Sequence, residues 1–163
     1  MEPASCRTVR FSDIGWTDVT ATTGLARHLV RMLGYEPAVT VLSVPVTFAS
    51  LKNRDIDVFL GNWMPAMAAD IRPYLADQSV EVVGANLNGA KYTLAVPAYL
   101  HEAGLKDFAD IREFATELEH EIYGIEPGND GNRLVLTLIK ENEFGLGDFE
   151  LVVTYKIQWP ANS

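Results

Sequence analysis

The chain has 163 residues, of which 48% are hydrophobic and 21% charged, the composition of a globular protein with a substantial core and not of a disordered chain. Its 22 acidic residues outnumber its 13 basic residues, and the net charge of −9 disfavours nucleic acid as a partner because the phosphate backbone is also negative. No stretch approaches the roughly 18–20 uninterrupted apolar residues of a membrane-spanning helix, and Cys6, as the single cysteine, can form no internal disulfide.

The first half of the chain alternates predicted strands and helices. The expected elements, in order, are a strand over Thr8–Asp13, a helix over about Thr17–Leu33 with apolar residues at helical spacing (Val19, Leu25, Leu29, Met32), a buried strand over Ala38–Val44, a short helix over Val46–Asn53, a strand over Ile56–Leu60, and a helix from Pro65 to about Tyr74. Three strand–helix units predict an α/β domain with a mostly parallel sheet.

The second half changes character at "KYTLAVPAYL" (Lys91–Leu100), which we interpret as the crossing into a second region. The elements expected after it are a helix over about Phe108–Leu118, a strand over Glu121–Ile125, a helix over Arg133–Glu141 and a strand over Phe149–Val153. The sequence contains no internal repeat.

Aromatic and polar residues follow the predicted strands directly. They are Trp16 and Asp18 after the first strand, Asn62 and Trp63 after the third, and Asn129 and Asp130 after "EIYGI", with Tyr92 at the crossover between the regions. Ligands of open α/β sheets bind at the carboxyl ends of the strands. Packing is the ordinary role of a tryptophan, whereas flanking glycines favour turns that project a side chain outward. Packing and ligand contact therefore both remain open for Trp16 and Trp63.

Several aromatic rings at one sheet edge favour a particular ligand chemistry. Ring faces attract a quaternary ammonium group by cation–π contact, and a carboxylate such as Asp18 adds Coulombic attraction or accepts a hydrogen bond from a ligand hydroxyl. A stacking platform for sugars or bases is the competing use of the same residues. The negative net charge disfavours nucleotides more than sugars.

Enzyme chemistry finds little support in the sequence. The histidines His28, His101 and His120 share no metal-ligand spacing, and the carboxylates of "EPGND" fit a loop and a helix start better than an acid–base pair. Phosphate-binding motifs such as GxGxxG are missing from the sequence. We therefore predict that the protein is not an enzyme and needs neither a cofactor nor a metal.

Four segments together resemble a known family: "VRFSDIGWTDVTATT", "VLSVPVTFASLKNRDIDVFLGNWMP", "GAKYTLAVP" and "IYGIEPGNDGN". They are similar to the substrate-binding proteins of quaternary-amine ABC transporters, the glycine betaine, proline betaine and choline group, and within it to the periplasmic choline-binding members. The resemblance implies a type II periplasmic-binding-protein-like fold with mostly parallel sheets in two lobes. It also implies an aromatic box for choline or a related quaternary amine, a permease as membrane partner, and a periplasmic location, although this chain shows no export signal.

Carried over position by position, the resemblance assigns five ligand-binding residues. Trp16, Trp63 and Tyr92 match members of the aromatic box, and Asp18 and Asn129 match the polar residues that contact the rest of the ligand. Choline is expected to bind better than glycine betaine, because Asp18 would repel the betaine carboxylate while accepting a hydrogen bond from the choline hydroxyl. A mutation of Asp18 to Asn should narrow that preference.

The resemblance covers about Cys6 to Val152 and corresponds to the N-terminal half of family members. It divides the chain into part of a first lobe (residues 1–90), part of a second lobe (91–153) and a divergent tail (154–163). A further box tryptophan and a C-terminal cysteine that would pair with Cys6 have no counterpart, and Trp159 is a weak candidate for the missing ring. The alternative interpretation is a truncated fragment that binds ligand weakly or not at all and self-associates through its incomplete lobes, forming a homodimer.

Overall fold

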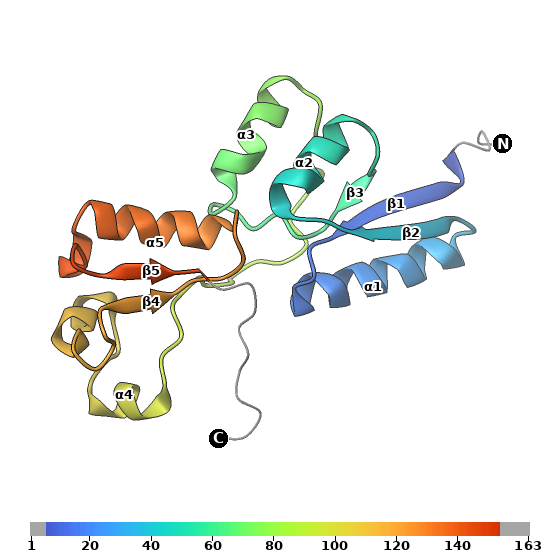
Figure 1. Cartoon of the computed structure of the whole chain (residues 1–163). Helices are drawn as coiled ribbons and strands as arrows, with labels where there is room; N and C mark the ends of the chain where they lie inside the picture. The colour runs from blue at the N-terminus through green and yellow to red at the C-terminus, as the bar shows by residue number, and fades with distance from the viewer. Residues whose placement is uncertain (1–5, 154–163) are drawn as a thin grey trace. The chain divides into compact units, whose positions relative to one another are not determined.

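The computed structural model describes residues 6–153 and divides into two compact units, unit 1 up to Asn88 and unit 2 from Gly89 (Figure 1). Each unit has its own sheet and its own hydrophobic core. Every strand pair in the described residues is parallel, so the α/β class with parallel sheets is confirmed. The assignment of the two regions and the tail to lobes of a binding protein stays a prediction.

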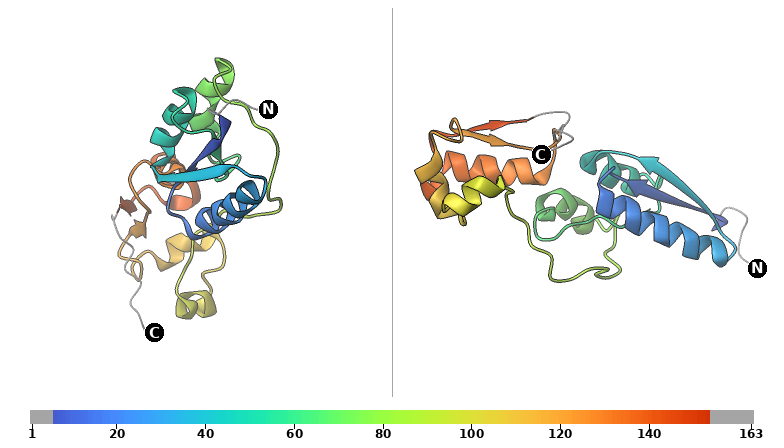
Figure 2. Two further views of the ribbon diagram at one scale, coloured as in Figure 1. Left: turned by 90° about the vertical axis from the view of Figure 1, so that its right-hand side faces the viewer. Right: turned by 90° about the horizontal axis from the view of Figure 1, so that it is seen from below.

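Unit 1 is built on a three-stranded sheet in the order β2-β1-β3. The strands are β1 (Thr8–Asp13), β2 (Glu36–Val41) and β3 (Val58–Phe59). The crossovers are α1 (Thr17–Met32) and α2 (Val44–Lys52), and α3 (Ala68–Ala76) follows β3. The chain runs from the central strand β1 to β2 at one edge, and then across β1 to β3 at the other edge. Because the two crossovers run in opposite directions and both are right-handed, α1 and α2 lie on opposite faces of the sheet, as Figures 1 and 2 show.

The core of unit 1 lies between the sheet, α2 and α3. We call Val44, Phe48, Met67 and Ile71 the unit 1 cluster, and each of these side chains is at most 4% exposed. A hydrogen bond of 2.7 Å between the buried hydroxyl groups of Ser12 and Thr47 joins β1 to α2 within this layer. The sheet edge and α2 are therefore fixed relative to each other by both apolar and polar contacts.

Helix α1 has two apolar sides, of which the sheet covers one. Val19 and Thr23 are buried, whereas Leu25, Leu29 and Met32 are 63%, 52% and 72% exposed. The helical spacing correctly predicted the helix, but these three residues do not join Val19 in the core. They lie on the side of the helix away from Val19 and Thr23, and no other described element of unit 1 covers them.

Several boundaries in unit 1 differ from the predicted ones. Helix α2 begins at Val44 and not at Val46, and β3 contains only Val58–Phe59 of the expected strand over Ile56–Leu60. Strand β2 begins at Glu36 and ends at Val41 because it pairs with β1 over its full length, from Thr8 opposite Glu36 to Asp13 opposite Val41. Helix α3 begins at Ala68 and not at Pro65. Pro65 instead follows a cis peptide bond in a turn that the Met67 N–H closes by donating to the Trp63 carbonyl at 2.9 Å.

Unit 2 contains a two-stranded parallel sheet covered by short helices. Its elements are α4 (Ala98–Ala103), the 3₁₀ helix η2 (Phe108–Phe114), β4 (Glu121–Tyr123), α5 (Asp130–Lys140), the 3₁₀ helix η3 (Glu143–Gly145) and β5 (Glu150–Val152). The core side chains are Leu100, Leu105, Ile111, Ile122, Leu146 and Phe149. Among the described residues, no helix has the length and apolar character needed to cross a membrane.

Both predicted helices of unit 2 have other bounds in the structure, and α4 and η3 were not predicted. The segment expected to be a helix over Phe108–Leu118 forms only η2, which starts with a capping box between Asp107 and Asp110. Helix α5 begins at Asp130 and not at Arg133, because the Asn129 side chain caps it. The prediction began too late because the first turn of α5 is polar and adds nothing to the apolar periodicity of the helix. The position of the capping residue determines where the helix begins.

Candidate functional site

The turn from β1 into α1 positions Trp16. Asp13, at the end of β1 and 6% exposed, accepts hydrogen bonds at Oδ1 from the Gly15 N–H at 2.8 Å and from Thr20 Oγ1 at 3.0 Å. Gly15 has a φ of 78°, a backbone conformation that favours glycine. Trp16 then takes the N-cap position of α1 and packs, half-buried, against the unit 1 cluster.

The segment after β3 positions Trp63 against the same cluster. Gly61 is buried there, and a Cβ atom at this position would lie 2.8 Å from Val19 Cγ2 and 2.9 Å from the Phe59 ring. Only a glycine lets the backbone pass this close to α1 and then turn toward Trp63. Unit 1 therefore brings Trp16 and Trp63 to one buried cluster, where each ring is packed on one side and partly exposed.

Asp18 lies in the first turn of α1 and is exposed. Its backbone carbonyl accepts a hydrogen bond from Thr22 Oγ1 at 2.9 Å, and its side chain is open to solvent. A carboxylate in the first turn also interacts favourably with the helix dipole. Asn62, the neighbour of Trp63, has a buried Oδ1 that accepts no hydrogen bond from the residues the structure describes.

In unit 2, Tyr92 and Asn129 meet at the start of α5. A Cβ atom at Gly131 would overlap Tyr92 Oη, so the phenol lies directly against the first turn of the helix. Asn129, which is 4% exposed, accepts the Gly131 N–H at 2.8 Å and donates from Nδ2 to Glu126 Oε1 at 2.9 Å. Partial burial, followed by the negative charges of Asp130 and Glu126, raises the pKa of Tyr92, which keeps the phenol neutral.

The structure thus groups the five predicted site residues by unit. Trp16, Asp18 and Trp63 belong to unit 1, and Tyr92 and Asn129 belong to unit 2. Trp159, the candidate for a missing ring, lies outside the described residues, and Cys6 is exposed and unpaired.

Two residues that shape the site were missed by the sequence reasoning. Asp13 is one, although an Asp two residues before a glycine at a strand end is a recognisable turn signal. Glu126 is the other, because its bond to Asn129 depends on the loop geometry.

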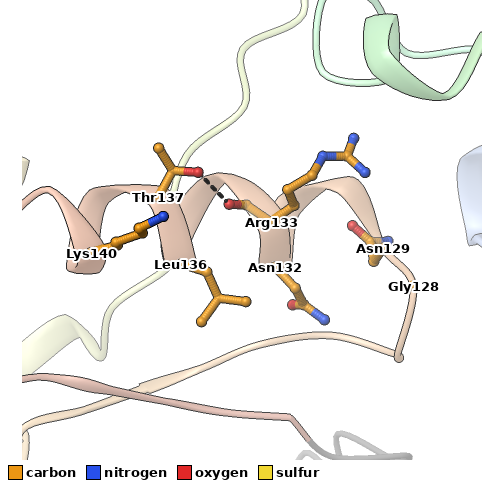
Figure 3. A pocket seen from close by; sticks show the side chains of 7 residues that line it. All are labelled: Gly128, Asn129, Asn132, Arg133, Leu136, Thr137 and Lys140. Atoms are coloured by element: carbon orange, nitrogen blue, oxygen red, sulfur yellow. Dashed lines mark hydrogen bonds between the residues drawn. The ribbon is translucent and has the colours of Figure 1, made fainter.

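A surface groove with a volume of about 360 Å³ lies along α5 (Figure 3). Its lining residues are Gly128, Asn129, Asn132, Arg133, Leu136, Thr137 and Lys140. The groove shares only Asn129 with the predicted site, contains no aromatic side chain and carries two cationic side chains. These features do not suit a quaternary ammonium ligand. Within residues 6–153 no group of three His, Cys, Asp or Glu residues is arranged to hold a metal ion.

Two α/β units with aromatic residues after parallel strands place the ligand-binding edge of each sheet where a solute could bind, and comparison with known families gives the class of protein. The model of the substrate-binding domain of ABC-type glycine betaine transport systems matches residues 7–160, so the chain belongs to this family. The family consists of solute-binding proteins of ABC transporters and not of enzymes. Such proteins work in the periplasm or outside the cell.

Individual relatives support the same placement. An ABC-transporter choline-binding protein, solved in complex with choline, is 61% identical with a TM-score of 0.87; the match covers 95% of this chain and 54% of that protein. Lactococcal OpuAC in its closed form with glycine betaine has the same fold, with a TM-score of 0.76 at 24% identity, over 91% of this chain and 55% of OpuAC. The uncharacterized protein ORF1 of Chromohalobacter salexigens is 53% identical over 80% of this chain and 84% of its own length. The chain therefore spans about half the length of these solved relatives.

Proposed function

We propose that the chain is the solute-binding component of an ABC importer and binds choline, or a related quaternary ammonium compound, in an aromatic box. The observation that carries this proposal is the 61% identity, over 95% of the chain, to a protein solved with choline. Delivery of the ligand to a membrane permease and a periplasmic location follow from the same proposal. No cofactor takes part in it.

The proposed contacts divide according to the chemistry of choline. Trp16, Trp63 and Tyr92 offer ring faces to the trimethylammonium group, which donates no hydrogen bond. The neutral phenol of Tyr92 adds no repulsive or attractive charge of its own. Asp18 accepts a hydrogen bond from the ligand hydroxyl, and Asn129 donates one to the hydroxyl oxygen. The carboxylate of glycine betaine would be repelled by Asp18, and this is the proposed basis of a preference for choline.

Substitution of Trp63 tests the aromatic box. A mutation of Trp63 to Leu keeps an apolar side chain against the unit 1 cluster but removes the ring face, and a mutation to Phe retains a smaller face. A cation–π contact of about 1–2 kcal/mol corresponds to a loss of roughly 5- to 30-fold in choline affinity for the Leu variant. The Phe variant should lose less. Equilibrium dialysis with labelled choline measures both, and wild-type affinity in a folded Leu variant would refute the box.

A second candidate function is self-association, and the exposed side of α1 favours it. Leu25, Leu29 and Met32 are spaced by four and then three residues, the spacing by which two helices pack along a seam. Within the described part of unit 1, no element covers this apolar side. We propose a second copy of the chain as the occupant, which would make a homodimer through α1.

The mass of the protein in solution tests this second candidate. Mutation of Leu29 to Glu should convert a dimer to a monomer at micromolar concentration, because it buries a charge in the seam. Mutation of Val83 to Glu introduces the same charge at a side chain that is 97% exposed and outside α1, and should leave the dimer intact. Sedimentation equilibrium distinguishes the two masses. A monomeric wild-type chain would rule out the homodimer.

A further inference from the structure

The amide of Asn129 is held in one orientation. Its Oδ1 accepts the Gly131 N–H at 2.8 Å, and its Nδ2 donates to Glu126 Oε1 at 2.9 Å. Only the amide oxygen can accept from a backbone N–H and only the nitrogen can donate to a carboxylate, so the two bonds exclude the flipped amide. Water offers little help to the flipped form, because the residue is 4% exposed.

This orientation determines what Asn129 can offer a ligand. The Nδ2 group has two hydrogens, and Glu126 takes one of them. The second hydrogen remains for a ligand atom that accepts a hydrogen bond. A hydroxyl oxygen satisfies that requirement, whereas a methyl group does not.

Glu126 is placed to control this orientation from outside the proposed contacts. It is exposed and lies in the loop between β4 and α5, three residues before Asn129. Its carboxylate also acts on Tyr92, the other proposed contact in unit 2. The bond to Glu126 supports the cap that Asn129 forms on α5. Without Glu126, the orientation of the amide that makes the cap would leave the buried Nδ2 without an acceptor in this loop.

We propose that Glu126 is a positioning residue that fixes the Asn129 amide as a hydrogen-bond donor, so that the site recognises the hydroxyl oxygen of its ligand. The inference rests on the proposed choline-binding function. It assigns discrimination between hydroxylated and purely alkyl quaternary amines to a residue that does not itself touch the ligand.

The test compares two ligands that differ at one group. Choline and propyltrimethylammonium have the same cationic head and similar size, but the latter carries a methyl group in place of the hydroxyl. Mutation of Glu126 to Ala should weaken choline binding about tenfold and change propyltrimethylammonium binding less than about twofold. Mutation of Glu126 to Gln retains an acceptor oxygen and should restore most of the choline affinity. Titration calorimetry on the full chain measures the affinity of each of the two variants for each of the two ligands, in comparison with wild type.

The controls separate positioning from a general loss of structure. Mutation of Glu102, an exposed residue of α4, to Ala removes the same charge from unit 2 and should change neither affinity. An equal loss for both ligands in the Glu126 to Ala variant would overturn the inference, and so would wild-type affinity for choline.

Failure of the proposed function can be told apart from failure of this inference. If the wild-type chain binds neither ligand, the function fails, and the side-chain amide signals of Asn129 in a ¹⁵N–¹H spectrum decide the positioning role. These signals should move in the Glu126 to Ala variant and stay near their wild-type positions in the Glu126 to Gln variant. Unchanged signals in the Ala variant would overturn the inference without reference to any ligand.

Discussion

At the scale of single residues, small backbone features decide where the tryptophans lie. The carboxylate of Asp13 organises the turn before Trp16, and Gly61 allows the chain to pass Val19 and Phe59 before Trp63. Both features place an aromatic ring at the end of a strand, where a polar turn is usual. The ring positions therefore depend on residues that would not touch a ligand.

Gly61 provides a direct test of this dependence. Mutation to Ala should destabilise unit 1 by about 1–3 kcal/mol, because the added Cβ atom overlaps Val19 and the Phe59 ring and the neighbours must shift. Mutation of Gly24 to Ala is the matched control. That position, inside α1, has no atom within 4 Å of an added Cβ, so the control should stabilise the protein by about 0.5–1 kcal/mol. Urea unfolding measures both. An unchanged free energy of unfolding in the Gly61 to Ala variant would contradict the close packing of Gly61 against Val19 and Phe59.

The residue scale also shows what the sequence could predict about the site. The positions of Trp16 and Trp63 after strands followed from the chain order, because each comes within a few residues of the end of a predicted strand. The contact of Gly61 with Val19 did not, since it joins two elements far apart in sequence. The hydrogen bond between Asn129 and Glu126 depends on the loop conformation, and the sequence pattern therefore did not predict it either.

At the scale of elements, pairing and capping set the boundaries that periodicity left uncertain. The ends of β2 follow those of β1, and α5 starts where Asn129 caps it. Strand and helix types were predicted correctly for most of the chain, because apolar spacing reports on them directly. The exposure of Leu25, Leu29 and Met32 was not predictable, since periodicity marks an apolar side of a helix without saying what covers it.

An ion pair joins β1 to the segment before β3 and makes stability depend on pH. Arg10 donates to the Asp57 carboxylate from Nη2 at 2.6 Å, from Nε at 2.9 Å and from its backbone N–H at 2.8 Å. These hydrogen bonds hold the pKa of Asp57 below its ordinary value of 3.8, against a smaller opposing effect of burial. A lowered pKa in the folded state means that the stabilisation is complete above about pH 3.8 and is lost as the pH falls through the folded value.

Mutation of Asp57 to Asn should therefore lower stability at pH 7, and the difference from wild type should shrink as the pH falls below about 3.8. We expect a modest effect, because both side chains are more than a third exposed. Mutation of Glu81, an exposed carboxylate of unit 1 that forms no ion pair among the described residues, to Gln is the control. Urea unfolding at several pH values checks the trend. A stability difference between wild type and variant that increases as the pH falls would contradict the prediction.

At the scale of the whole molecule, the chain combines two α/β units of a solute-binding family with about half the length of solved relatives. The fold class and family could be predicted from the sequence, because several long motifs span both units. Whether five residues in two units act on one ligand is a property of the whole chain, and no single element determines it. The central claim is therefore about binding by the intact chain.

Isothermal titration of the purified chain with choline, with glycine betaine as comparator, tests that claim most directly. We predict saturable heat with choline, weaker binding of glycine betaine, and roughly 5- to 30-fold weaker choline binding in the Trp63 to Leu variant. A working box in a chain of this length would then be established. The absence of heat at millimolar choline, from a folded protein, would contradict the account.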